Sequence, residues 1–160
     1  MSRRMRRSIE KKLKKAKRAL VEISMDEQSL VLCEKLSEYK SAAKALRPAI
    51  KEYEAANKAY VKKQSAKNEM RRKAAEDTRY ACALNYKSVG DSISASLDKE
   101  DALFEELKQY VPAKKYNKLS FRREKGRERY LSKMTKIEDG VNDKIDVAAL
   151  VSQNSGDKEA

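Results

Sequence analysis

Clustered lysines and arginines are the side chains of this sequence with the clearest chemical use. Residues 1–18 hold ten of them against Glu10 alone, and residues 113–136 hold another ten against two glutamates. Each block repels itself unless an anion neutralises it, and polyphosphate backbones commonly do so. The candidate nucleic-acid-binding residues are therefore Arg3, Arg4, Arg6, Arg7, Lys11, Lys14, Lys15, Arg18, Lys114, Lys115, Arg122, Arg123, Arg127 and Arg129.

The two basic blocks also suit roles that do not involve nucleic acid. A basic surface can serve solubility, or it can dock on an acidic protein surface. A basic helix with an apolar stripe can also lie on an acidic membrane surface, although residues 9–23 offer no Trp or Phe to insert. No run of about 18 apolar residues is present, so we expect no membrane span.

Residues suited to catalysis or metal binding are scarce. The chain has no His, which removes the usual general base and the commonest metal ligand. Its two cysteines, Cys33 and Cys82, are too few for a zinc site, and no Gly-rich phosphate loop or nucleophile elbow occurs. The acidic cluster at 138–146 lacks the order of a calcium loop. We expect no enzyme, no metal and no cofactor.

The same cysteines indicate a compartment. Two thiols do not form a disulfide framework, which is typical of a reducing environment, so we expect an intracellular protein of the cytoplasm, the nucleoid or nucleus, or a virion. The Arg-rich, acid-poor start also suits a mitochondrial presequence. Because Ser2 and Ser8 are the only early serines, we treat this segment as part of the mature protein.

Three aromatic residues are interleaved with the second basic block, as in stacking platforms for single strands. Tyr116 and Tyr130 share an apolar stripe fourteen residues apart, so their spacing predicts core packing. Phe121 lies off that stripe. Exposure of Phe121 would therefore distinguish a binding role from a packing role.

The elements that carry these residues are expected to be all-α. Four Gly and two Pro are too few for the turns of a β-rich fold, and strong helix formers dominate. We predict an elongated helical hairpin or coiled-coil bundle in a single domain over 1–151. Its helices span about 5–23, 26–86 with a kink near Pro48, 92–111, 113–138 and 141–151, with a disordered tail at 152–160.

Two apolar seams run along the predicted helices at heptad spacing. The first contains Ile9, Leu13, Ala16, Leu20 and Ile23, and one face of that helix should pack on protein. Ser24 to Glu27 then match a capping box, which predicts a new helix start. The second seam runs over 32–60 and contains Leu32, Leu36, Tyr39, Ala43, Leu46, Ile50, Tyr53, Asn57 and Tyr60. We expect the side chains of this seam to pack against helix 92–111 or, preferably, against a second copy of the chain.

These patterns favour a non-catalytic basic helical protein that binds the nucleic-acid backbone, DNA or RNA, as a component of a larger nucleoprotein or viral assembly. The alternative is a coiled-coil assembly or adaptor protein whose basic ends dock on acidic protein surfaces. The direction in which the basic faces point, relative to the apolar seams, distinguishes the two.

Overall fold

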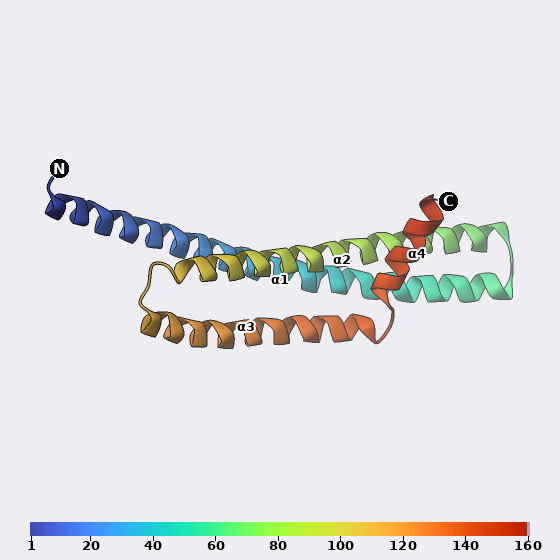
Figure 1. Ribbon diagram of the computed structural model, residues 1–160. Helices are drawn as coiled ribbons and strands as arrows, with labels where there is room; N and C mark the ends of the chain where they lie inside the picture. Colours follow the sequence, from blue (N-terminus) through green and yellow to red (C-terminus); the bar gives the residue numbers. More distant parts are fainter. Residues whose placement is uncertain (160) are drawn as a thin grey trace. The chain divides into compact units, whose positions relative to one another are not determined.

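Four α-helices make up the regular structure of the described part of the chain. The computed structural model describes residues 1–159, with side chains over residues 1–153. α1 spans Arg3–Lys62, α2 Ala66–Leu107, α3 Ala113–Asn142 and α4 Val147–Glu159 (Figure 1), and no strand occurs in this range. The all-α prediction is confirmed. The elongated, coiled-coil form of the bundle stays a prediction.

The turn between α1 and α2 falls inside the predicted helix 26–86, which is therefore wrong in extent. The Ser65 hydroxyl accepts a hydrogen bond from the Asn68 backbone N–H at 3.1 Å and caps the start of α2. The Asn68 side-chain amide donates to the carbonyls of Ala59 and Lys63 at 3.3 and 2.9 Å. These bonds satisfy backbone groups on both sides of the turn, so the break costs little.

α1 runs without a break through Ser24–Glu27, where the sequence predicted a new helix start, and through Pro48, where a kink stays a prediction. Ser24 to Glu27 match a capping box but lie in mid-helix, because no Gly or Pro stops the strong helix formers around them. Pro48 also lies inside α1. Its ring removes one backbone hydrogen bond, a loss that packing on either side of Pro48 outweighs.

Two glycines that fall between predicted helices, at 86–92 and at 138–141, lie inside helices of the structure. Gly90 is in α2 and Gly140 is in α3, and no described glycine has a positive φ. A Cβ at Gly90 would lie 3.3 Å from Tyr39 Cε1, and one at Gly140 would overlap the Arg47 guanidinium. These glycines therefore permit close approach of a neighbouring side chain and do not supply a turn.

The C-terminal helices also extend past their predicted ends. α3 continues to Asn142 and not to 138, and the Asp146 carboxylate accepts from the Ala149 N–H at 3.1 Å to cap α4. α4 then covers residues 152–159, where we expected a disordered tail, because the cap and the following alanines favour continued helix. Ala160, also part of that predicted tail, lies outside the described residues.

The chain divides into two compact units. Unit 1 comprises Met1–Glu34 and Ile93–Leu131, and unit 2 comprises Lys35–Ser92 and the chain from Ser132 onward. The core of unit 1 joins α1, α2 and α3: Val21 packs with Phe104, Leu107 and Val111. The Tyr116 ring from α3 stacks on Phe104 with a centroid distance of 4.6 Å. This core fixes which face of α3 points inward.

Unit 2 contains an antiparallel pair formed by the second part of α1 and the first part of α2. Three side-chain stacks join them: Tyr39 with Tyr86, with centroids 4.6 Å apart, and two arginines over tyrosine rings. The Arg79 guanidinium lies 3.6 Å from the Tyr53 centroid and that of Arg72 lies 4.1 Å from Tyr60. The hydroxyl of Tyr39 lies 2.9 Å from that of Tyr86.

This pairing gives most of seam 32–60 a partner that the sequence did not predict. Within unit 2 the seam packs against α2 before Ile93, where Leu46 and Ile50 are buried. Tyr53, Asn57 and Tyr60 of the seam are only half-buried. Pairing of this seam with a second copy of the chain stays a prediction. The partner segment escaped notice because alanines such as Ala75 and Ala83, together with arginine stacks, replace the bulky apolar residues that mark a seam.

Candidate nucleic-acid interface

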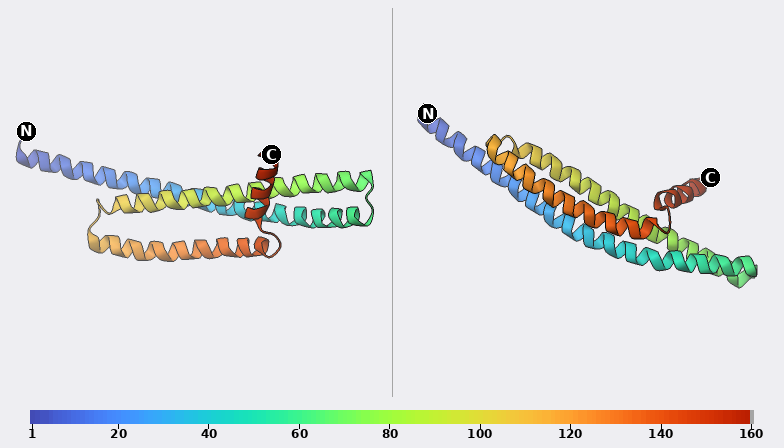
Figure 2. Two further views of the ribbon diagram at one scale, coloured as in Figure 1. Left: turned by 45° about the vertical axis from the view of Figure 1, so that its right-hand side comes forward. Right: turned by 90° about the horizontal axis from the view of Figure 1, so that it is seen from below.

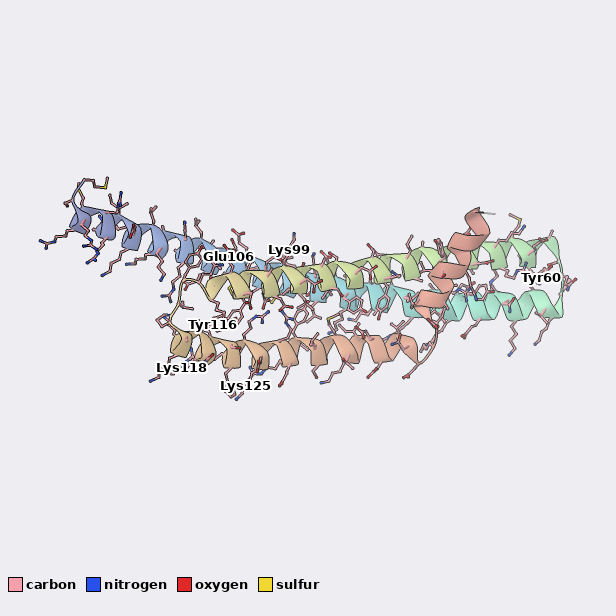
Figure 3. All side chains as sticks on the ribbon, in the orientation of Figure 1. Tyr60, Lys99, Glu106, Tyr116, Lys118 and Lys125 are labelled. Carbon is pink, nitrogen blue, oxygen red and sulfur yellow. The ribbon has the colours of Figure 1, made fainter. Side chains whose placement is uncertain are left out.

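The outward face of α3 in unit 1 carries an unbroken row of cations. At 3.6 residues per turn, six side chains fall within an arc of about 100° on the side opposite the core. They are all exposed, and none forms an ion pair within the described residues: Lys114, Lys115, Lys118, Arg122, Lys125 and Arg129. Figure 3 shows Tyr116 directed toward α2, while Lys118 and Lys125 point away from it. We call this row the α3 basic face.

Two predicted site residues, Arg123 and Arg127, do not belong to the α3 basic face. Arg123 donates to Glu100 at 3.0 Å and also to Asp101, and it lies 4.7 Å from the Phe104 centroid. Arg127 donates to Asp101 at 2.9 Å. Burial raises the pKa of Asp101, but hydrogen bonds from both arginines outweigh burial and hold it below its usual value. These arginines join α3 to α2.

The N-terminal turns of α1 supply the other basic surface of unit 1. Seven predicted residues are exposed there: Arg3, Arg4, Arg6, Arg7, Lys11, Lys14 and Lys15. Arg18 is half-buried and donates to Glu22 at 2.8 Å, one helical turn away. Figure 2 shows these first turns extending past the loop between α2 and α3. Their cations are therefore open to a large anion.

The first apolar seam is exposed, contrary to the packing that the sequence predicted. Ile9, Leu13, Leu20 and Ile23 are 40% to 64% accessible to solvent. Within unit 1, α1 instead packs into the core with Val21 and Met25, which lie on a different side of the helix. The covered face therefore changes near the point where the first seam ends, at Ile23, because the second seam begins nine residues later and out of heptad register with it. The predicted seam is an apolar stripe with no partner in the described chain.

Sequence reasoning omitted two members of the α3 basic face, Lys118 and Lys125. The steps from Lys114 through Lys118, Arg122 and Lys125 to Arg129 are 4, 4, 3 and 4 residues, which is the spacing of one helical face. Counting the charges of the block 113–136, without testing their helical spacing, left these two lysines out of the predicted site. The same test separates Arg123 and Arg127, which follow the apolar stripe of Tyr116 and Tyr130.

A groove of about 290 Å³ lies beside the α2–α3 ion pairs of unit 1, and Cys33, Gly126 and Tyr130 are among the residues that line it. The Tyr130 hydroxyl donates to the Leu32 carbonyl at 2.8 Å. Burial raises the pKa of Tyr130 to about 12, and charge on Cys33 and Glu100 adds to the effect. Tyr130 thus holds α3 against α1.

Over residues 1–159 no cluster of His, Cys, Asp and Glu is suited to holding a metal ion, and no helix combines the length and the apolar composition of a membrane span.

Comparison with known proteins gives no relative: no family model, curated protein or solved structure matches this chain.

Proposed function

We propose that the protein binds the phosphate backbone of nucleic acid through the α3 basic face and the N-terminal turns of α1, as a component of a larger nucleoprotein or viral assembly. The observation that carries the proposal is the α3 basic face: six exposed cations on one side of a helix, without carboxylate partners in the described residues. Helical cations of this kind contact phosphates and read little base sequence.

The dimensions of the face suit a polyanion. Residues 114–129 span about 22 Å of helix, whereas duplex DNA carries a phosphate charge every 1.7 Å or so of its axis. Each cation can therefore reach a separate phosphate. The predicted site residues of both basic blocks also fall in unit 1, although more than half of the chain separates the two blocks in sequence. Two basic surfaces in one unit favour joint engagement of one strand.

The first prediction concerns the salt dependence of binding. Replacing Lys114, Lys115, Arg122 and Arg129 with Gln should weaken binding to all duplex sequences alike. It should also flatten the slope of log K against log salt by up to about 4, because each lost duplex contact removes about 0.9. Fluorescence anisotropy of labelled duplexes across a salt series measures both effects.

A matched control replaces Lys40, Lys44, Lys51 and Lys58 with Gln, four exposed lysines of α1 that lie outside both basic blocks. This variant loses the same charge and should keep most of the salt slope. An equal loss in both variants would reduce the proposal to a net-charge effect. No binding of the native chain to duplex or single strand at about 0.15 M salt would refute it.

A second candidate function, docking on an acidic protein, is favoured by the exposed apolar stripe of α1. Ile9, Leu13, Leu20 and Ile23 sit on a helix whose other faces are basic, and a partner helix that is apolar and acidic would match both. Replacing Leu13 and Leu20 with Gln separates the two functions. The substitution should abolish docking on such a partner but leave the salt slope for nucleic acid unchanged.

A further inference from the structure

Phe121 is an exposed aromatic ring within the α3 basic face. The chain has two phenylalanines: Phe104 is buried in the core of unit 1, whereas Phe121 is 60% accessible to solvent. Its position on α3 is directed away from the stripe of Tyr116 and Tyr130, so it contributes nothing to the core. Its ring therefore offers a flat apolar surface that remains open to a ligand.

The surroundings of Phe121 define the chemistry of that contact. Phe121 lines a shallow groove of about 440 Å³ together with Lys114, Asn117, Lys118 and Arg122. The Lys125 ammonium lies 4.5 Å from the ring centroid, a cation–π contact that orients the ring. The groove thus combines one flat aromatic surface, one side-chain amide and several cations.

We infer that this groove binds single-stranded nucleic acid, with an unpaired base stacked on the part of the Phe121 ring that Lys125 leaves open. The inference rests on the proposed function and narrows its ligand from nucleic acid in general to single strands. Bases in a duplex stack on one another and cannot offer a face to Phe121, whereas an unpaired base can. The flanking cations then neutralise the phosphates on either side of that base, and the Asn117 amide lies within the groove to bond a base edge.

Charge and shape together favour this ligand over an acidic peptide. An acidic peptide would satisfy the lysines but has no flat π-system that regularly accompanies its charges. In a nucleic-acid strand every base is flanked by phosphates, so one exposed ring flanked by cations matches one unpaired base with its neighbouring phosphates. Stacking tolerates any base, in keeping with recognition that depends little on sequence.

The test compares Phe121→Leu with the native chain on four probes: an oligothymidine strand, an abasic strand of equal length, a duplex, and polyglutamate. Removing the ring should weaken binding to oligothymidine by about 5- to 150-fold, the factor equivalent to a stacked base. Binding to the abasic strand and to the duplex should stay unchanged, because those contacts use phosphates alone. Circular dichroism and thermal unfolding should match the native chain, since the ring is outside the core.

A second variant reports the stack directly. The chain contains no Trp, so Phe121→Trp introduces a sole fluorophore at the proposed contact. Its emission should be quenched by oligothymidine and should remain unaffected by the duplex or by polyglutamate.

The two proposals fail in different ways. If Phe121→Leu keeps native affinity for oligothymidine while the duplex still binds, the stacking inference is overturned and backbone binding stands. Equal weakening on polyglutamate would also overturn the inference, in favour of an acidic peptide ligand. If neither strand nor duplex binds the native chain, both proposals fall.

Discussion

Arg122 and Arg123 are adjacent in sequence but have different environments. One helical step of about 100° places Arg122 on the α3 basic face and Arg123 against Glu100 and Asp101 of α2. Four residues after Arg123, Arg127 repeats the inward position, and seven residues after Arg122, Arg129 repeats the outward one. At the scale of single residues, the angular position of an arginine on α3 thus decides whether it packs against α2 or is available for binding, and its residue type does not.

Replacing the inward arginines should therefore affect stability more than binding. We expect Arg123→Gln with Arg127→Gln to lower the free energy of unfolding by about 1–3 kcal/mol, because Glu100 and Asp101 would lose their charged hydrogen-bond donors. The salt slope for nucleic acid should change little. Chemical denaturation and anisotropy measure the two quantities.

The matched control replaces Arg122 and Arg129 with Gln, which removes the same charge from the outward side of α3. Its free energy of unfolding should stay within about 0.5 kcal/mol of the native value, while its salt slope falls. If the inward and outward pairs changed stability equally, the division of roles between the two sides of α3 would be wrong.

At the scale of the helices, the glycines differ in how closely a neighbouring side chain approaches them. Gly90 faces Tyr39, whose ring is stacked on Tyr86 and has little room to move. Gly126 lies in α3 with nothing within 4 Å of an added Cβ. Neither has a positive φ, so both conformations suit any residue. The two glycines differ only in the space around them.

Substituting these glycines should shift stability in opposite directions. Gly126→Ala should raise the free energy of unfolding by about 0.5–1 kcal/mol, because alanine loses less conformational entropy in a helix. Gly90→Leu should lower it by about 1–3 kcal/mol through overpacking against the Tyr39 ring. Urea denaturation of both variants, with Gly126→Leu as the size-matched control, measures the difference. A stabilised Gly90→Leu would show that the Tyr39–Tyr86 stack yields easily.

At the scale of the whole molecule, the exposed first turns of α1 and the packed core of unit 1 have different roles. The predicted site residues of both basic blocks lie in unit 1, but the N-terminal turns of α1 add exposed residues only, and the core of that unit begins at Val21. Short helices that pack on nothing are only marginally stable in water. The first turns of α1 therefore belong to the binding surface more than to the core.

Deleting residues 2–15 should consequently separate binding from stability. We expect the free energy of unfolding to change by less than about 0.5 kcal/mol, as for other exposed positions. The salt slope should flatten, because seven exposed cations of the predicted site are lost. Thermal unfolding and a salt titration test both expectations. A large loss of stability would mean that this segment packs on the protein in solution.

The sequence by itself determined the fold class and the location of the charge. Scarce Gly and Pro, with abundant helix formers, are local properties, and they led to the helical assignment without knowledge of any neighbour. Heptad spacing also identified residues buried in unit 2, such as Leu46 and Ile50. The basic blocks and the off-stripe position of Phe121 were likewise readable from residue order.

Only the tertiary structure decided which faces are covered. The stripe from Ile9 to Ile23 has the pattern of a packed seam yet is exposed, while the alanines of α2 lack that pattern and are buried. Periodicity describes a helix by itself, but burial depends on what lies beside it. Three features depend on partners distant in sequence: the inward position of Arg123, the close approach of Tyr39 to Gly90, and the presence of the predicted site residues of both basic blocks in unit 1. Contacts of that kind leave no local signal, which is why helix propensity and charge counting could not predict them.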